Sequence, residues 1–288
     1  MRIHAIIITY EIYFVNNIQI KYVRFVYYKK FFQNSLTYRK KCLTILCVRG
    51  GMDVMNERFK RQSLIIGEDA TDTLASKRVA LFGVGGVGSY AAEALARSGI
   101  GHLVLVDHDT VSVSNINRQL CALTSTVGLP KVDVTAARMR DINPDIDVLA
   151  LKQFFLPENA DSFNFSEYDF VIDAIDTVSA KIEIAVRCTA AGVPMISSMG
   201  TGNKLCPTAL KVEDLAKTTG CPLARVMRRE LKARGIIHLP VVYSEEAPIK
   251  PQSDEQSVSG KAVPGSVAFV PSVAGLIAAS EAVKALLK

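Results

Sequence analysis

The sequence predicts an α/β fold of the Rossmann-like type, a mostly parallel sheet with helices on both faces. Between residues 77 and 200, short apolar runs alternate with segments of helical spacing, and several runs end in glycine or aspartate. Short apolar runs bounded by turn residues are typical of strands buried on both faces. Because such strands alternate with helices, we expect parallel pairing and a ligand site beyond the carboxyl ends of the strands.

Local composition places the elements in chain order. We expect strands over residues 78–82, 103–106, 146–150, 170–172 and 194–197. We expect helices over residues 87–98, 131–141 and 179–191. After residue 200 the regular alternation of strand and helix patterns ends, which predicts a C-terminal α+β extension. It would hold one or two helices over 213–234, a strand over 238–244, an exposed loop over 246–266 and a helix over 271–287.

Charge is distributed unevenly along the chain. Of its 34 basic and 28 acidic residues, residues 1–51 hold nine basic residues and one acidic residue, which leaves a net charge of −2 for the remainder. The overall excess of positive charge therefore gives no reason to assign nucleic-acid binding to the whole chain.

Residues 1–51 are rich in Ile, Tyr, Phe, Lys and Asn and contain no apolar run long enough for a membrane span. Alternation over residues 3–20 is compatible with a strand. We favour a non-native or disordered extension, such as AT-rich upstream DNA would encode, with the natural start at Met52 or Met55. We then expect one domain over 52–288, with a nucleotide-binding core over 77–200 and a substrate-facing part over 201–288.

Six cysteines occur, and none forms a Cys-x-x-Cys pair. This pattern argues against a zinc site of four thiolates. Without a secretory signal, we expect a cytoplasmic protein with reduced cysteines and no membrane association.

A glycine-rich motif, Gly83-Val-Gly85-Gly86-Val-Gly88, follows the first expected strand and opens a helix. Glycines allow the backbone to approach phosphates closely, and the helix N-terminus favours an anion. Asp107 lies at the end of the next strand, where an acidic residue that binds ribose is expected. To this point, a nicotinamide-dependent oxidoreductase fits as well as an ATP-dependent enzyme.

Charged residues after the other strand ends favour ATP. A triphosphate attacked at its α-phosphorus needs cations around its oxygens and usually a carboxylate that holds Mg²⁺. Arg118 and Lys131 are candidate cations, and Asp176 is the candidate metal ligand. A dinucleotide site, or a regulator that only binds an adenylate, needs fewer cations.

The motifs together resemble the ThiF/MoeB/HesA superfamily, bacterial relatives of ubiquitin-activating enzyme. They occur in family order: Arg58-Phe-Lys-Arg61-Gln62, the glycine motif, Asp107-x-Asp109, Asn115-x-Asn117-Arg118-Gln119, Gly128-x-Pro130-Lys131 and Asp173-Ala-Ile-Asp176. The resemblance implies an adenylating enzyme that uses ATP and Mg²⁺. It implies nucleotide contacts at Gly83, Gly85, Gly86, Gly88, Asp107, Asp109, Asn115, Arg118 and Lys131, and Mg²⁺ at Asp176. It also implies a homodimer in which Arg61 completes the neighbouring ATP site, with catalysis by Arg61, Arg118, Lys131 and Asp176.

The later part of the chain indicates which branch of this superfamily the sequence resembles. Family members that activate sulfur carriers have paired zinc cysteines and a late cysteine nucleophile, and this sequence has neither. Four segments resemble the tRNA threonylcarbamoyladenosine dehydratases: Asp173-Ala-Ile-Asp176, Asp214-Leu-Ala-Lys217 with the residues that follow it, Tyr243-Ser-Glu-Glu246 and Pro251-Gln-Ser. This implies ATP-dependent cyclising dehydration of N6-threonylcarbamoyladenosine in tRNA through an acyl-adenylate. Cys221 is then a buried or loop thiol.

Two alternatives stay open. One is adenylation of the C-terminal glycine of a ubiquitin-like sulfur-carrier protein, and a sulfur-transfer or activator protein is a further partner that the family allows. The second concerns a basic segment that we interpret as the tRNA surface, against the alternative of an ordinary solvated helix face. It comprises Lys217, Arg225, Arg228, Arg229 and Lys232, the last four at helical spacing.

Overall fold

The computed structural model describes residues 6–15, 18–29, 39–47, 54–252 and 263–288, with side chains from residue 57 onward. The chain forms two compact units, Met1–Arg58 and Phe59–Lys288. In the first unit, strands β1 (Ile6–Val15), β2 (Ile18–Lys29) and β3 (Arg39–Cys47) pair in antiparallel order β1-β2-β3. Whether residues 1–51 form a disordered extension in the natural protein stays a prediction. The non-native origin of residues 1–51 stays a prediction.

The second unit is built on a seven-stranded sheet in the order β6-β5-β4-β7-β8-β10-β9. All neighbours pair in parallel except β9 and β10, which are antiparallel. The strands are β4 (Arg78–Phe82), β5 (His102–Val106), β6 (Asp147–Leu151), β7 (Phe170–Asp173), β8 (Met195–Ser198), β9 (Leu210–Asp214) and β10 (Pro240–Ser244). This confirms the predicted α/β class and each strand expected between residues 77 and 200.

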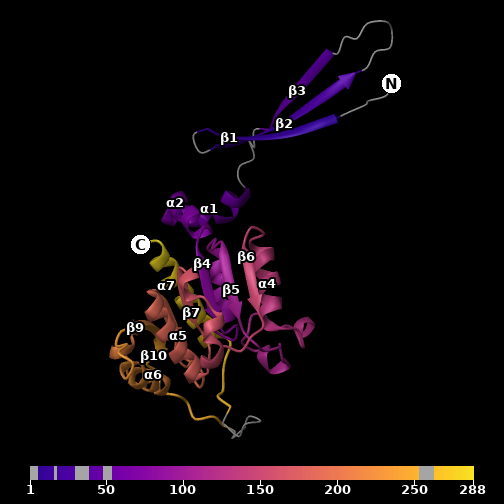
Figure 1. The fold of residues 1–288 in the computed structure, drawn as a ribbon. Coiled ribbons are helices and arrows are strands. Elements are labelled where there is room, and N and C mark those ends of the chain that lie inside the picture. The colour runs from indigo at the N-terminus through magenta and orange to yellow at the C-terminus, as the bar shows by residue number, and fades with distance from the viewer. Residues whose placement is uncertain (1–5, 16–17, 30–38, 48–53, 253–262) are drawn as a thin grey trace. The chain divides into compact units, whose positions relative to one another are not determined.

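Helices cover both faces of this sheet (Figure 1). The helices of the described residues are α1 (Val54–Ile66), α2 (Glu68–Ala75), α3 (Gly88–Arg97), α4 (Lys131–Ile142), α5 (Val178–Ala191), α6 (Pro222–Lys232) and α7 (Phe269–Leu286). Alternate residues of β4 enter two separate cores. Val79 and Leu81 pack with side chains of α3, α4 and α7, whereas Ala80 and Phe82 pack with side chains of α5 and α6. Helices α1 and α2 were not predicted from the sequence.

Helix α7 is the one helix of the described residues that is long and apolar enough for a membrane span by length and composition. It packs against α3, and Val270, Ala274, Ala278 and Ala282 are fully buried in the core. A Cβ atom on Gly275 would lie 2.2 Å from the Val87 carbonyl oxygen. The apolar composition of α7 thus serves close packing between two helices.

The C-terminal extension differs from the prediction at one place. A helix was expected from residue 213, but Leu210–Asp214 form strand β9 and Leu215–Lys217 form a short 3-10 turn. The helical part, α6, begins only at Pro222. Strand β9 lies at the sheet edge, where Lys211 and Val212 are exposed, so its mixed composition resembles that of a solvent-exposed helix.

Candidate active site

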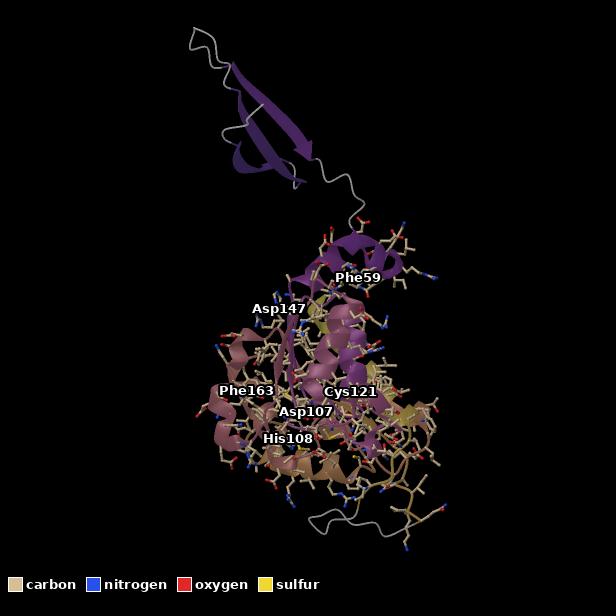
Figure 2. The ribbon with its side chains drawn as sticks, turned by 90° about the vertical axis from the view of Figure 1, so that its right-hand side faces the viewer. Phe59, Asp107, His108, Cys121, Asp147 and Phe163 are labelled. Carbon is tan, nitrogen blue, oxygen red and sulfur yellow. The ribbon has the colours of Figure 1, made fainter. Side chains whose placement is uncertain are left out.

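A cavity of about 690 Å³ opens at the carboxyl ends of β4, β5, β7 and β8. Figure 2 shows Asp107 and His108 at this end of the sheet, with Asp147 at the opposite end, where β6 begins. The cavity therefore lies where a mostly parallel sheet places its ligands, as the sequence predicted.

The four motif glycines divide into two pairs. Gly83 has φ +88°, and a Cβ there would lie 2.6 Å from the Ala174 carbonyl oxygen; a Cβ on Gly88 would lie 1.8 Å from the Gly83 carbonyl oxygen. Both positions must be glycine for the backbone to close on itself. Gly85 and Gly86 line the cavity, and a Cβ on Gly85 would meet only the side-chain amide of Gln119, at 3.9 Å. Gly85 therefore leaves room for a ligand, whereas a Cβ on Gly86 would lie 3.1 Å from Pro271.

Asp107 holds the glycine loop from the end of β5. Its Oδ2 accepts the Val84 N–H at 2.6 Å, and its Oδ1 accepts the Asp109 N–H at 2.8 Å. An ionised carboxylate has about four acceptor sites, so these two bonds leave acceptor capacity for a ligand.

Two predicted cations line this cavity, and they differ in whether a carboxylate neutralises their charge. Lys131 is 4% exposed, and its Nζ lies 2.7 Å from Oδ2 of Asp109. Arg118 donates to the Ser114 carbonyl oxygen at 2.8 Å and to Oδ1 of Asn117 at 2.9 Å. Among the described side chains, no carboxylate lies within 4.0 Å of Arg118. Its guanidinium charge is therefore available to an anion, whereas that of Lys131 is already compensated.

Asp176 is exposed and lines the cavity beyond the end of β7. The turn that carries it is fixed by a buried ion pair: Nζ of Lys181 lies 2.9 Å from Oδ2 of Asp173 and donates to the Ile175 carbonyl oxygen at 3.0 Å. Ser197 Oγ also donates to Asp173, at 2.6 Å. Sequence reasoning missed Lys181, because a lysine within a helix gives no signal of burial.

Three further side chains of the cavity wall were not predicted. The rings of His108 and Phe154 lie 4.2 Å apart between centroids at an angle of 73°. Gln119 is 7% exposed, and its Oε1 has no hydrogen-bond partner in the described structure. A buried amide oxygen without a partner is costly, so Gln119 fits a site that accepts a donor from a ligand.

The chain that forms this cavity is similar to known proteins over most of its length. Residues 59–288 match the family model described as the ThiF family. The chain belongs to the ThiF family. It is 47% identical over 244 residues to a tRNA threonylcarbamoyladenosine dehydratase of Bacillus subtilis (strain 168), covering 81% of this chain and 96% of that protein. This confirms the resemblance inferred from the motifs.

A solved structure agrees over a similar extent. The E. coli tRNA N6-threonylcarbamoyladenosine dehydratase in complex with ATP superimposes with a TM-score of 0.75 at 37% identity, covering 82% of this chain and 96% of that chain. Likeness to the sulfur carrier protein ThiS adenylyltransferase of Escherichia coli (strain K12) is shorter. It is 37% identical over 152 residues, which cover 51% of this chain and 60% of that protein.

The remaining predicted residues of this ThiF-family chain lie outside the cavity. Arg61 is exposed on α1 and does not line the cavity of its own chain. On α6, Arg225, Arg229 and Lys232 are exposed. Arg228 departs from the prediction. It is half-buried and donates to the Leu215 carbonyl oxygen at 2.9 Å and to Thr218, so it holds the preceding turn instead of facing solvent with its neighbours.

The cysteines with described side chains show one exposed thiol. Cys121, Cys188 and Cys221 are buried and Cys206 is exposed. Burial raises the pKa of the Cys121 thiol despite the nearby charge of Lys131, and burial together with Asp173 raises that of Cys188. The expectation that Cys221 is a buried thiol is confirmed, and the two buried thiols with raised pKa are poor nucleophiles.

Proposed function

We propose that this chain is an ATP-dependent tRNA threonylcarbamoyladenosine dehydratase. The observation that carries the proposal is one cavity that combines a glycine loop with open space, an uncompensated guanidinium at Arg118 and an exposed carboxylate at Asp176. Names and bound ligands of the similar proteins support the same activity. The likeness to a sulfur-carrier adenylyltransferase covers only about half of the chain, so we do not favour that alternative.

The nucleotide would extend along the strand ends. Asp107 has acceptor capacity for ribose hydroxyls, and Gly85 and Gly86 let phosphate oxygens approach the backbone. Arg118 would neutralise phosphate charge directly. Asn115 and Lys131 also line the cavity and would contribute further donors, with Asp109 holding Lys131 in place.

Asp176 is the residue best suited to hold Mg²⁺. Its carboxylate has one weak described partner, the Thr177 hydroxyl at 3.4 Å, and Mg²⁺ prefers carboxylate and phosphate oxygens. The ion would neutralise charge on the triphosphate. The buried Asp173–Lys181 pair would keep the turn in place while Asp176 binds the metal.

In the proposed reaction, the threonyl carboxylate of the modified adenosine attacks the α-phosphorus of ATP, and pyrophosphate leaves. The carbamoyl group of the same side chain then attacks the activated carbonyl carbon, and AMP leaves. The net change in the nucleoside is the loss of one water. Because the second nucleophile belongs to the substrate, its effective concentration is high and no cysteine of the enzyme is required.

Exposed side chains suggest how partners bind. Arg225, Arg229 and Lys232 are exposed on α6 and would contact tRNA phosphates, with Lys217 on the preceding turn. Arg229 would have to exchange its contact with Glu230, at 2.8 Å, for a phosphate. Leu64 and Ile65, at the end of α1, are 82% and 86% exposed. Large exposed apolar side chains of this kind favour an interface, so we propose a homodimer in which Arg61 serves the partner's cavity. A cytoplasmic location follows from the tRNA substrate.

The test measures modified nucleosides and AMP together. Wild-type protein, ATP and tRNA that carries threonylcarbamoyladenosine should give a nucleoside lighter by one water and release AMP. Asp176→Asn should lower the rate of both by about a hundredfold, the order expected for loss of one electrostatic contact to a reacting phosphate. Asp72→Asn, an exposed residue of α2, is the matched control. Undiminished AMP formation by Asp176→Asn, or retention of NAD by the purified protein, would refute the proposal.

A further inference from the structure

Among the residues with described side chains, three lysines are almost completely buried: Lys131 at 4%, Lys181 at 0% and Lys204 at 4% exposure. Lys131 and Lys181 each lie within 3 Å of a carboxylate oxygen, at 2.7 Å and 2.9 Å. Lys204 donates instead to the main-chain carbonyl oxygen of Glu246. Within the described residues it has no carboxylate within 4.0 Å. A buried ammonium without a counter-ion is strongly unfavourable, so an anion supplied from elsewhere would stabilise it.

The carboxylate of Glu246 is the candidate counter-ion for Lys204 within the chain, but it binds main-chain amides instead. It accepts the N–H groups of Leu205 and Cys206, each at 2.9 Å. These two amides, followed by the charge of Lys204, hold the pKa of Glu246 below its usual value. Glu246 therefore fixes the backbone that follows Lys204 and does not form an ion pair with the ammonium.

Lys204 lines the same cavity as Asp107. Four adjacent strands, in the order β5-β4-β7-β8, deliver the functional groups: Asp107 after β5, the glycine loop after β4, Asp176 after β7 and Lys204 after β8. The proposed ribose and phosphate ligands occupy the first part of this row. In this strand order, Lys204 follows β8, which lies next to β7 on the side away from the glycine loop.

The loop that carries Lys204 is held firmly. Asn203, with φ 58°, exchanges two hydrogen bonds with Gly265, at 2.7 Å and 2.6 Å, and its carbonyl oxygen accepts the Ile249 N–H at 2.8 Å. Cys221, Pro222 and Leu223, at the start of α6, also line the cavity, and no side chain caps this helix. A free helix N-terminus adds partial positive charge to that of Lys204.

We propose that Lys204 binds the substrate carboxylate that attacks ATP, an inference that rests on the proposed function. The ligand must be anionic, because it is the counter-ion of a buried ammonium, and it must enter from the β8 side of Asp176. The threonyl carboxylate meets both conditions. A charge-assisted hydrogen bond from the buried Lys204 would hold this carboxylate toward the α-phosphorus.

The experiment measures two affinities for the wild type, Lys204→Gln and Lys204→Met, with Lys284→Met as the control on an exposed face of α7. Glutamine keeps a donor for the Glu246 carbonyl oxygen but removes the charge. The first affinity is that for ATP alone. The second is the preference for tRNA with threonylcarbamoyladenosine over the same tRNA without this modification, measured in the absence of ATP.

We expect both Lys204 variants to lose at least about tenfold of the wild-type preference for modified tRNA, the order of one charged hydrogen bond. ATP affinity should stay within about twofold, which also establishes that the variants fold. A fall in ATP affinity with an unchanged tRNA preference would make Lys204 a phosphate ligand and overturn the proposal. An effect of methionine that glutamine does not share would assign Lys204 a purely structural role, and that too would overturn it.

Failure of this inference can be distinguished from failure of the proposed function. If wild-type protein releases no AMP with modified tRNA and ATP, the proposed function itself is wrong. If the wild type is active and prefers modified tRNA, but both Lys204 variants keep that preference, only the assignment of Lys204 is wrong.

Discussion

Replacing Lys181 with methionine should destabilise the second unit more than any surface substitution. Lys181 and Asp173 have no exposed side-chain area, and their charged atoms lie 2.9 Å apart. Removing one partner of a buried pair typically costs about 3–5 kcal/mol, because the other charge stays buried. Asp173 would keep its hydrogen bonds from the Ser197 hydroxyl and the Ile175 N–H. We therefore expect the free energy of unfolding to fall by about 3 kcal/mol, a large share of the 5–15 kcal/mol of a typical native protein.

Urea unfolding followed by circular dichroism provides the measurement, since the chain contains no tryptophan. The double variant Lys181→Met/Asp173→Asn removes both charges and should recover at least half of the loss. Lys284→Met removes one partner of an exposed pair with Glu281 and should cost less than about 1 kcal/mol. If Lys181→Met costs no more than this control, or the double variant is less stable than the single one, the reasoning about the buried pair is refuted.

Three further predictions follow from other contacts. Gly88→Ala should prevent folding, because its Cβ meets a carbonyl oxygen, whereas Gly85→Ala should fold and bind ATP more weakly, as calorimetry would measure. Glutamate at Arg225 and Arg229 should lower tRNA affinity and its salt dependence; unchanged binding would exclude this surface. Because the pKa of Glu246 is lowered in the folded protein, the ionised carboxylate stabilises the fold fully above pH 4.5, and this contribution is lost as the pH falls through the folded pKa. The loss should be detected as faster hydrogen exchange of the Leu205 and Cys206 amides.

The sequence predicted the parallel core well because its signals are local. Each apolar run of β4, β5 and β7 lies between turn residues, and both faces of these strands are buried, so hydrophobicity alone marks them. Strand β9 was missed because it is short, lies at the edge and carries charged residues on its exposed side. Composition cannot distinguish such a strand from one turn of a polar helix.

The candidate site was predicted only where residue type and motif order are informative. Gly85, Gly86, Asp107, Arg118 and Asp176 follow strand ends and do line one cavity. Burial of a charge depends on tertiary packing, which no spacing rule encodes. For this reason, Lys181 and Lys204 were not predicted.

The same limit explains why the half-buried position of Arg228 was not predicted. Helical spacing places it beside Arg225 and Arg229, but only the fold of residues 215–218 reveals carbonyl groups within its reach.

The contact between α3 and α7 has a consequence for synthesis of the protein. Gly275 packs against the backbone at Val87, and Pro271 lies where a Cβ on Gly86 would approach it within 3.1 Å. The loop that faces the cavity is therefore completed only once α7 has been translated. Because domains fold as units during translation, a nascent chain that still lacks α7 has no finished pocket, and a ligand of this pocket cannot stabilise it on the ribosome.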